Sequence, residues 1–178
     1  MSDFLFITFG DSVSLANGLN IYADTVSTKL QYTSLGFMAK TRNWYPSLSM
    51  NEAIKKCSFI INEFSSTFIY GGSMGGYAAI KYSKKLKASH TLVCCPQWSI
   101  DPYECGNNRN GYEKYFSENL SGMSIKPEDI SGHIYVLYDP RHSIDSFHFS
   151  KIKYQSQNVI GICTDYIGHH VTTMISGS

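Results

Sequence analysis

The chain has 178 residues, and its 15 lysines and arginines nearly balance its 14 aspartates and glutamates, so the formal net charge is +1 at pH 7. A chain with so little net charge does not have the excess of basic residues that a nucleic-acid-binding protein needs, and we expect no nucleic-acid partner. No apolar run approaches the ~20 residues of a membrane-spanning helix, and the N-terminus does not look like a leader segment. We therefore expect a cytoplasmic protein without a membrane span. Its length predicts a single domain over residues 1–178.

The cysteines argue against a disulfide framework and against a zinc site. There are five of them, an odd number, and no two have the CxxC spacing of a metal-binding pair. We expect reduced thiols, and we predict no metal ion and no cofactor. The cysteines are Cys57, Cys94, Cys95, Cys105 and Cys163.

Six apolar runs, in chain order, predict the strands of one sheet. They show little alternation with polar residues, which is typical of strands covered on both faces, and therefore of a largely parallel sheet with crossover helices. The predicted strands are 4–9, 36–40, 67–70, 90–95, 134–138 and 158–164. Helices are predicted at 49–64, 75–86, 145–154 and from Val171 onward. The expected fold class is α/β, a three-layer α/β/α sandwich with a mostly parallel sheet of about six strands.

Residues 96–130 form the irregular part of the chain. This segment is rich in Tyr, Asn, Gly, Ser and Pro, and it is too long for an ordinary connection between two elements. We predict a long lid-like insertion that binds substrate, with Trp98 and Tyr103 as candidate substrate-binding residues. The aromatic side chains of this segment could also form a surface for a protein partner or a sugar.

A glycine-flanked serine follows the third predicted strand. The sequence from Gly71 to Gly75 has the spacing GxSxG with Ser73 at its centre, after an apolar run and before helix-forming residues. This order is typical of a nucleophile elbow, a sharp strand-to-helix turn that exposes the serine hydroxyl. A serine hydroxyl at its ordinary pKa is a poor nucleophile, so the elbow implies a histidine base and a carboxylate that orients it.

Candidates for both groups follow the last two predicted strands. Asp139 comes directly after strand 134–138 and is our first choice for the acid. The alternate is Asp145, which is also well placed to cap the next helix. After strand 158–164 comes Gly168-His169-His170, where we prefer His169 as the base and keep His170 as its alternate.

The oxyanion hole requires backbone amides near the nucleophile. The first donor is predicted to be the amide of Met74, the residue after the serine. The second should come from the loop after the first strand, where Gly10 lets the backbone approach a ligand closely.

Taken together, the segments FIYGGSMGGYAA, VLYDP and YIGHHV resemble the nucleophile, acid and base segments of the α/β-hydrolase superfamily. The resemblance extends over nearly the whole chain and implies a serine esterase, thioesterase or acyltransferase that works through an acyl-enzyme. Ser73, Asp139 and His169 match the family's triad position by position. The implied substrate is a small-molecule or glycan-linked acyl compound. An HGGG-type oxyanion motif is missing, and the chain begins too close to its first strand for the two leading strands of larger members.

Two other functions compete with this one. The segment Phe9-Gly10-Asp11-Ser12 resembles the GDS block of SGNH-type esterases, in which Ser12 would be the nucleophile and Asp145 and His148 its acid and base. That hypothesis leaves the elbow unexplained. Alternatively, the chain keeps a hydrolase-like scaffold without catalysis and binds a glycan or a protein, because fold alone does not establish activity.

Overall fold

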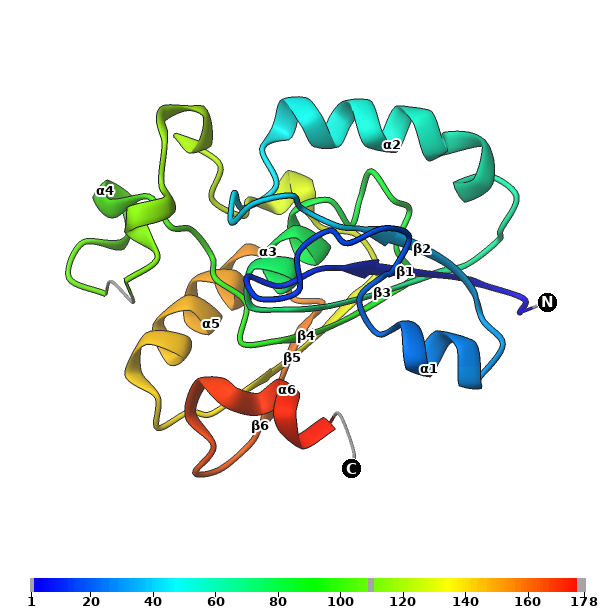
Figure 1. The fold of residues 1–178 in the computed structure, drawn as a ribbon. Helices are drawn as coiled ribbons and strands as arrows, with labels where there is room; N and C mark the ends of the chain where they lie inside the picture. Colours follow the sequence, from blue (N-terminus) through cyan, green and yellow to red (C-terminus); the bar gives the residue numbers. More distant parts are fainter. Residues whose placement is uncertain (1, 109–110, 176–178) are drawn as a thin grey trace.

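The computed structural model describes residues 2–108 and 111–175, which form one six-stranded sheet with helices on both faces (Figure 1). All neighbouring strands are parallel, and their order is β2-β1-β3-β4-β5-β6. The strands are β1 (Leu5–Phe9), β2 (Thr33–Phe37), β3 (Thr67–Gly72), β4 (His90–Cys94), β5 (His133–Tyr138) and β6 (Val159–Cys163). The helices are α1 (Asp24–Lys29), α2 (Ser47–Ile61), α3 (Ser73–Lys81), α4 (Pro102–Cys105), α5 (Ser143–Gln155) and α6 (Val171–Ile175).

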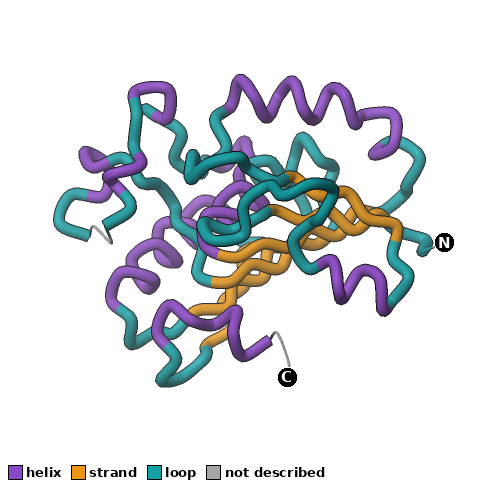
Figure 2. Tube along the Cα trace, in the orientation of Figure 1, coloured by secondary structure: helices purple, strands orange, loops and turns teal. Residues whose placement is uncertain are grey.

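Helices cover both faces of the sheet, as the three-layer prediction requires. In Figures 1 and 2, α2, α3 and α5 lie on one side of the strands, while α1 and α6 lie on the other. The central strands carry the core because apolar side chains point to both faces: β1 is buried along its whole length, and Ile69, Val93 and Val136 are fully buried in the next three strands. The predicted α/β fold class is confirmed.

The individual elements follow the predicted pattern with local differences. The second strand lies at Thr33–Phe37, earlier than expected, because Tyr32 to Leu35 pack beside β1 although polar residues interrupt the run. Helix α1 was not predicted, since its six residues are too few to show a helical period. Helix α3 begins at Ser73, directly after the strand, and ends at Lys81.

The strand order places a topological switch point next to the predicted nucleophile. From β1 the chain passes to β2 on one side and then returns to β3 on the other side of β1. Loops that leave the carboxyl ends of β1 and β3 therefore diverge, and such switch points are where open parallel sheets bind ligands. Ser73 follows β3 at this point.

The segment 96–130 is more than a covering loop. Within its described part it contains α4 and the 3-10 turns Glu113–Tyr115, Glu118–Leu120 and Pro127–Asp129. Leu120, Met123 and Ile125 are buried in the main core, so the end of the segment is fixed to the domain. Its lid function stays a prediction.

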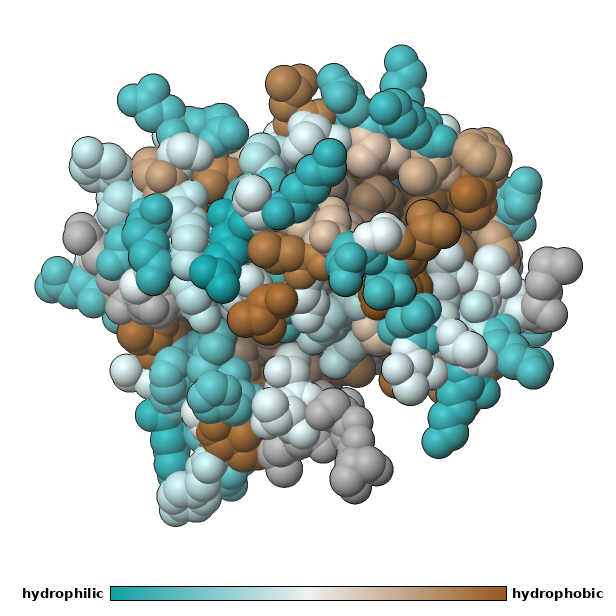
Figure 3. Space-filling view, viewed as in Figure 1, coloured by the Kyte–Doolittle hydropathy of each residue, from teal (hydrophilic) through white to brown (hydrophobic). Residues whose placement is uncertain are grey.

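Polar side chains cover most of the face seen in Figure 3, and hydrophobic ones are scattered among them. Within residues 2–108 and 111–175, none of the helices combines the length and the apolar character needed to cross a bilayer. The edge strand β6 is the least covered strand of the sheet, with Ile160 and Ile162 both more than two-fifths exposed.

Candidate active site

Two glycines shape the turn that carries Ser73. A Cβ at Gly71 would lie 2.5 Å from the carbonyl oxygen of Gly75, and a Cβ at Gly75 would lie 2.4 Å from that of Phe9. Main-chain atoms are therefore in direct contact where the end of β3, the first turn of α3 and the end of β1 come together. Ser73 has a φ of +47°, a left-handed conformation that costs a residue with a Cβ roughly 1–2 kcal/mol. This geometry is that of a nucleophile elbow.

The structure brings Ser73, His169 and Asp145 together from three elements. Ser73 Oγ lies 3.3 Å from His169 Nε2. On the other side of the ring, His169 Nδ1 lies 2.9 Å and 3.0 Å from the two carboxylate oxygens of Asp145. A carboxylate only accepts, so Nδ1 carries the proton and Nε2 is free to accept the serine proton. Asp145 is 2% exposed, and its charge is therefore poorly screened by water.

Asp139, our first choice for the acid, does not contact the imidazole in this geometry. Its carboxylate accepts the amides of Arg141 at 2.9 Å and of Ile167 and Gly168 at 2.8 Å each. These amides, that of Gly168 foremost, lower the pKa of Asp139. The carboxylate thus ties the end of β5 to the loop that carries His169. The correction has a simple cause: the strand-end position suits the backbone of that loop, whereas the first turn of α5 reaches the ring.

The sequence suggested helix capping for Asp145, but another side chain has that position. His142 is the residue before α5, and its Nδ1 accepts the amide of Asp145 at 3.3 Å. The same nitrogen lies 3.0 Å from Asp145 Oδ2. The imidazole of His142 thus takes the cap position, and the Asp145 carboxylate bonds to His169 instead.

Cys95 is a third neighbour of the acid. Its buried thiol lies beside the Asp145 carboxylate and donates to the Gly168 carbonyl at 4.0 Å, and burial, followed by the charge of Asp145, raises the pKa of the thiol. Cys95, Asp145 and His169 are the one group of three in the described part of the chain with donor atoms close enough, within 4.8 Å, to hold a metal ion. The imidazole N–H already bonds to the carboxylate and the thiol keeps its proton beside it, which explains the cluster without a metal.

The alternate base and the competing SGNH arrangement do not assemble. His170 is exposed, and its amide bonds to Ile167 within its own turn. His148 is 1% exposed, and its Nδ1 accepts the amide of Trp98 at 3.2 Å. Ser12 lies in the loop after β1, where its carbonyl accepts Arg42 Nε at 2.8 Å. Because Asp145 is engaged by His169, no Ser12, Asp145 and His148 relay forms.

The predicted oxyanion donors differ in their availability. Met74 is the second residue of α3, in the first turn, where amides lack partners within the helix and where the helix dipole favours negative charge. The amide of Gly10 donates instead to the Phe37 carbonyl at 3.1 Å, where it continues the pairing of β1 with β2. Gly10 is therefore committed to the sheet, and its assignment as a donor is corrected.

The predicted substrate-binding residues bond to partners other than Ser73. The Trp98 indole N–H donates to the Ile125 carbonyl at 2.9 Å, and its ring packs against the main core. Tyr103 is 92% exposed, and its amide is part of the cap of α4. Tyr112 of the same segment approaches the site instead: its hydroxyl lies 3.3 Å from His169 Nε2 and also bonds to Ser73.

No protein-family model matches the sequence, and no curated protein does. Solved structures match over nearly the whole chain. The capsule O-acetyltransferase of Neisseria meningitidis serogroup A aligns over 98% of this chain and 85% of its own, with a TM-score of 0.66 and 14% identity. The Pyrococcus furiosus esterase Pf2001 aligns over 97% and 76%, with a TM-score of 0.61 and 16% identity. A Xanthomonas campestris putative hydrolase of the alpha/beta superfamily aligns over 99% and 92%, with a TM-score of 0.51 and 13% identity.

The chain has the α/β-hydrolase fold. Within that fold the elbow follows β3, the acid candidate follows β5, and the imidazole follows β6, which is the order the sequence predicted. Identities of this size establish the arrangement of the backbone and leave the chemistry to be argued from the side chains.

Several side chains at the site were missed by sequence reasoning, because no motif of the α/β-hydrolase fold identifies them. Cys95 and Tyr112 contact the acid and the base, respectively. Trp44 and Gln97 meet each other beside Ser73. For Gln97 the only signal in the sequence is its place at the start of the irregular segment 96–130.

His148 makes folding dependent on pH. Burial lowers its pKa to about 4, below the ordinary value of 6.5, so the unfolded chain binds this proton more readily than the folded one. Stability should therefore fall as the pH decreases from about 6.5 to 4, by about 3 kcal/mol from this group. In the variant His148→Asn, whose side-chain oxygen can still accept the Trp98 amide, urea unfolding at pH 7, 5.5 and 4.5 should show a shallower loss. An equal slope in both proteins would contradict the assignment.

Proposed function

We propose that the protein is a serine-dependent acyl-transfer enzyme with Ser73 as nucleophile, His169 as base and Asp145 as acid. The observation that carries this proposal is the continuous relay from Ser73 Oγ through both nitrogens of His169 to a buried carboxylate, built on a left-handed elbow. A decayed scaffold has no reason to keep such a relay at such a backbone cost. The proposal replaces Asp139 by Asp145.

The reaction starts with the Ser73 proton. As Oγ attacks an ester or thioester carbonyl, His169 Nε2 takes the proton, and the Asp145 carboxylate stabilises the imidazolium through the Nδ1–H bond. His169 then protonates the leaving alcohol or thiol, and an acyl group remains on Ser73. Water or another hydroxyl next gives its proton to His169, attacks the acyl carbon and releases the serine.

The oxyanion needs two amides, and we assign them to Met74 and Asp11. The Asp11 amide donates to no acceptor among the described residues, unlike that of Gly10. The Asp11 side chain accepts the amides of Val13 and Ser14, which fixes the loop. That loop follows the end of β1, which lies against Gly75 of α3, so the loop starts beside the first turn of the helix that contains Met74. Each such donor is worth about 3 kcal/mol in the transition state.

Two fates of the acyl group are compatible with this site. Similar structures include an esterase and a capsule O-acetyltransferase, and the side chains at the relay do not distinguish water from a sugar hydroxyl as the acceptor. The Tyr112 hydroxyl lies 3.3 Å from His169 Nε2, close to the position from which either acceptor, water or a sugar hydroxyl, would give up its proton.

Burst kinetics with p-nitrophenyl acetate test the function. We expect a rapid release of about one nitrophenolate per chain, followed by slower turnover, because acylation precedes deacylation. Mass spectrometry should find one acetyl group on the peptide that carries Ser73. Adding an oligosaccharide should raise the steady-state rate and yield an acetylated sugar if a hydroxyl is the acceptor, and should yield only acetate if water is. A folded sample with neither burst nor turnover would favour the non-catalytic binding module.

A further inference from the structure

Gln97 is a fully buried side chain that touches the nucleophile. It follows β4 by three residues and is 0% exposed. Its carboxamide nitrogen lies 3.3 Å from Ser73 Oγ and 3.2 Å from the carbonyl oxygen of Cys95. Its carboxamide oxygen lies 3.3 Å from the indole nitrogen of Trp44. The carboxamide of Gln97 is thus hydrogen-bonded through both its nitrogen and its oxygen to partners inside the protein.

The network fixes which end of the amide faces the serine. An indole N–H can only donate, so the atom that meets Trp44 Nε1 must be the carboxamide oxygen. The NH₂ group then has its two protons directed at the Cys95 carbonyl and at Ser73 Oγ. Trp44 and the Cys95 carbonyl oxygen together determine that Ser73 faces a donor rather than an acceptor.

The three partners of Gln97 share an unusual backbone conformation. Ser73, Cys95 and Trp44 have φ values of +47°, +44° and +49°, although none of them is glycine. Such conformations are uncommon for residues with a Cβ, and they persist where the surrounding structure enforces them, often at functional sites. Three independent turns are thus held in strained conformations that converge on one carboxamide.

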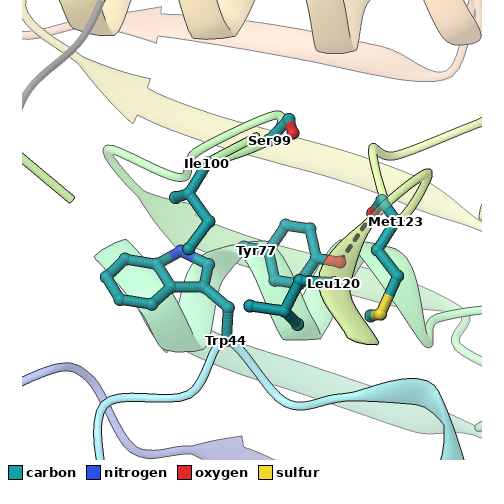
Figure 4. A pocket seen from close by; sticks show the side chains of 6 residues that line it. All are labelled: Trp44, Tyr77, Ser99, Ile100, Leu120 and Met123. Carbon is teal, nitrogen blue, oxygen red and sulfur yellow. Dashed lines mark hydrogen bonds between the residues drawn. The ribbon is translucent and has the colours of Figure 1, made fainter. Parts of the chain in front are cut away.

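The turn that carries Trp44 is held firmly from both sides. Tyr45, the next residue, is also left-handed, with a φ of +52°. Its hydroxyl reaches the carbonyl oxygens of Gly10 at 2.7 Å and Phe37 at 3.0 Å, and its own carbonyl accepts the Tyr82 hydroxyl. The Trp44 indole is 1% exposed and lines a small hollow (Figure 4) together with Tyr77, Ser99, Ile100, Leu120 and Met123.

We propose that Gln97 is a catalytic residue that donates a hydrogen bond to the nucleophile oxygen, and that Trp44 is the residue that positions it. In acylation, the Ser73 Oγ–C bond forms while the hydroxyl proton moves to His169 Nε2 and the carbonyl electrons move to the oxyanion. The Gln97 N–H stabilises the negative charge that develops on Oγ while this proton leaves. In deacylation the Oγ–C bond breaks, and the same donor stabilises the departing serine oxygen until His169 returns its proton. This inference depends on the proposed acyl-enzyme chemistry.

Two variants of similar shape separate donation from packing. Gln97→Met and Gln97→Glu keep the length of the side chain, and neither has an N–H; the second still offers an oxygen to Trp44. We expect both to slow the burst phase with p-nitrophenyl acetate about 100-fold, with little change in KM. Trp44→Phe should cause a smaller loss, because the carboxamide remains but loses one of the two contacts that fix its orientation. Thermal unfolding of each variant identifies any that do not fold. If Gln97→Met does not fold, Gln97→Glu alone tests the loss of the N–H donor.

A double variant tests whether Trp44 acts through Gln97. If it does, Trp44→Phe combined with Gln97→Met should be no slower than Gln97→Met alone, since the group being positioned is already gone. Gln155→Met is the matched control: its carboxamide bonds to the Lys151 carbonyl at the exposed end of α5, so the burst rate should be unchanged. Wild-type burst rates in both Gln97 variants, or losses that multiply fully in the double variant, would overturn the inference. A folded wild-type protein with neither burst nor turnover would instead refute the proposed function.

Discussion

Replacing Ser73 by alanine is expected to reduce turnover of p-nitrophenyl acetate roughly 10⁴-fold or more while leaving the fold intact. The hydroxyl is the only group of the relay that can form a bond to the acyl carbon, because His169 reaches the substrate through that oxygen. The alanine Cβ occupies the same space as the serine Cβ, so residue 73 should keep its left-handed backbone conformation. Steady-state rates and thermal unfolding measured on the same samples check both parts of this expectation.

Ser12→Ala is the matched control for that experiment. Ser12 lies in the loop after β1 and contributes its carbonyl, not its hydroxyl, to the bond with Arg42. Its replacement should leave turnover within about twofold of wild type, because alanine keeps the backbone carbonyl that bonds to Arg42. If Ser12→Ala were inactive and Ser73→Ala active, the SGNH-type alternative would be favoured.

The second large effect concerns the two aspartates. Asp145→Asn should lower kcat on the order of 10³- to 10⁴-fold, because an amide can present its NH₂ to His169 Nδ1 and favour the tautomer whose Nε2 cannot accept the serine proton. Asp139→Asn should retain much more of kcat and show a lower melting temperature, because its carboxylate accepts three backbone amides of the turns at the ends of β5 and β6.

The pH dependence of stability adds an independent check on Asp139. Its pKa is lowered in the folded state, so the stability it contributes is present at neutral pH and is lost as the pH falls through that lowered value. Asp139→Asn should lack this loss in strongly acidic solution, whereas Asp145→Asn should keep it. A result in which Asp139→Asn abolishes kcat and Asp145→Asn does not would reverse the two assignments.

The sequence predicted the fold and the order of the site well, for physical reasons. Buried parallel strands are continuous apolar runs. Gly71 and Gly75 are required because a Cβ at either position would lie closer than 3 Å to a backbone atom. Both signals are local, so they survive without knowledge of the tertiary structure. The choice of His169 over His170 also agrees with the geometry, although the basis was only the preceding Gly168.

The parts that could not be predicted depend on contacts between distant segments. Asp139 and Asp145 both follow β5, and only the path of the loop after β6 determines which one meets the ring. Gly10 is a plausible oxyanion donor in sequence, but its amide is taken by the neighbouring strand β2. Trp44 and Gln97 are 53 residues apart and become partners only through two strained turns.

The central claim is that Ser73 is the residue that becomes acylated, and covalent labelling tests it most directly. A fluorophosphonate probe should react with the folded wild-type protein, and peptide mapping by mass spectrometry should locate the adduct on Ser73. The label should persist in Ser12→Ala and disappear in Ser73→Ala. An adduct on Ser12, labelling that survives in Ser73→Ala, or a folded wild-type protein that does not react would contradict the account.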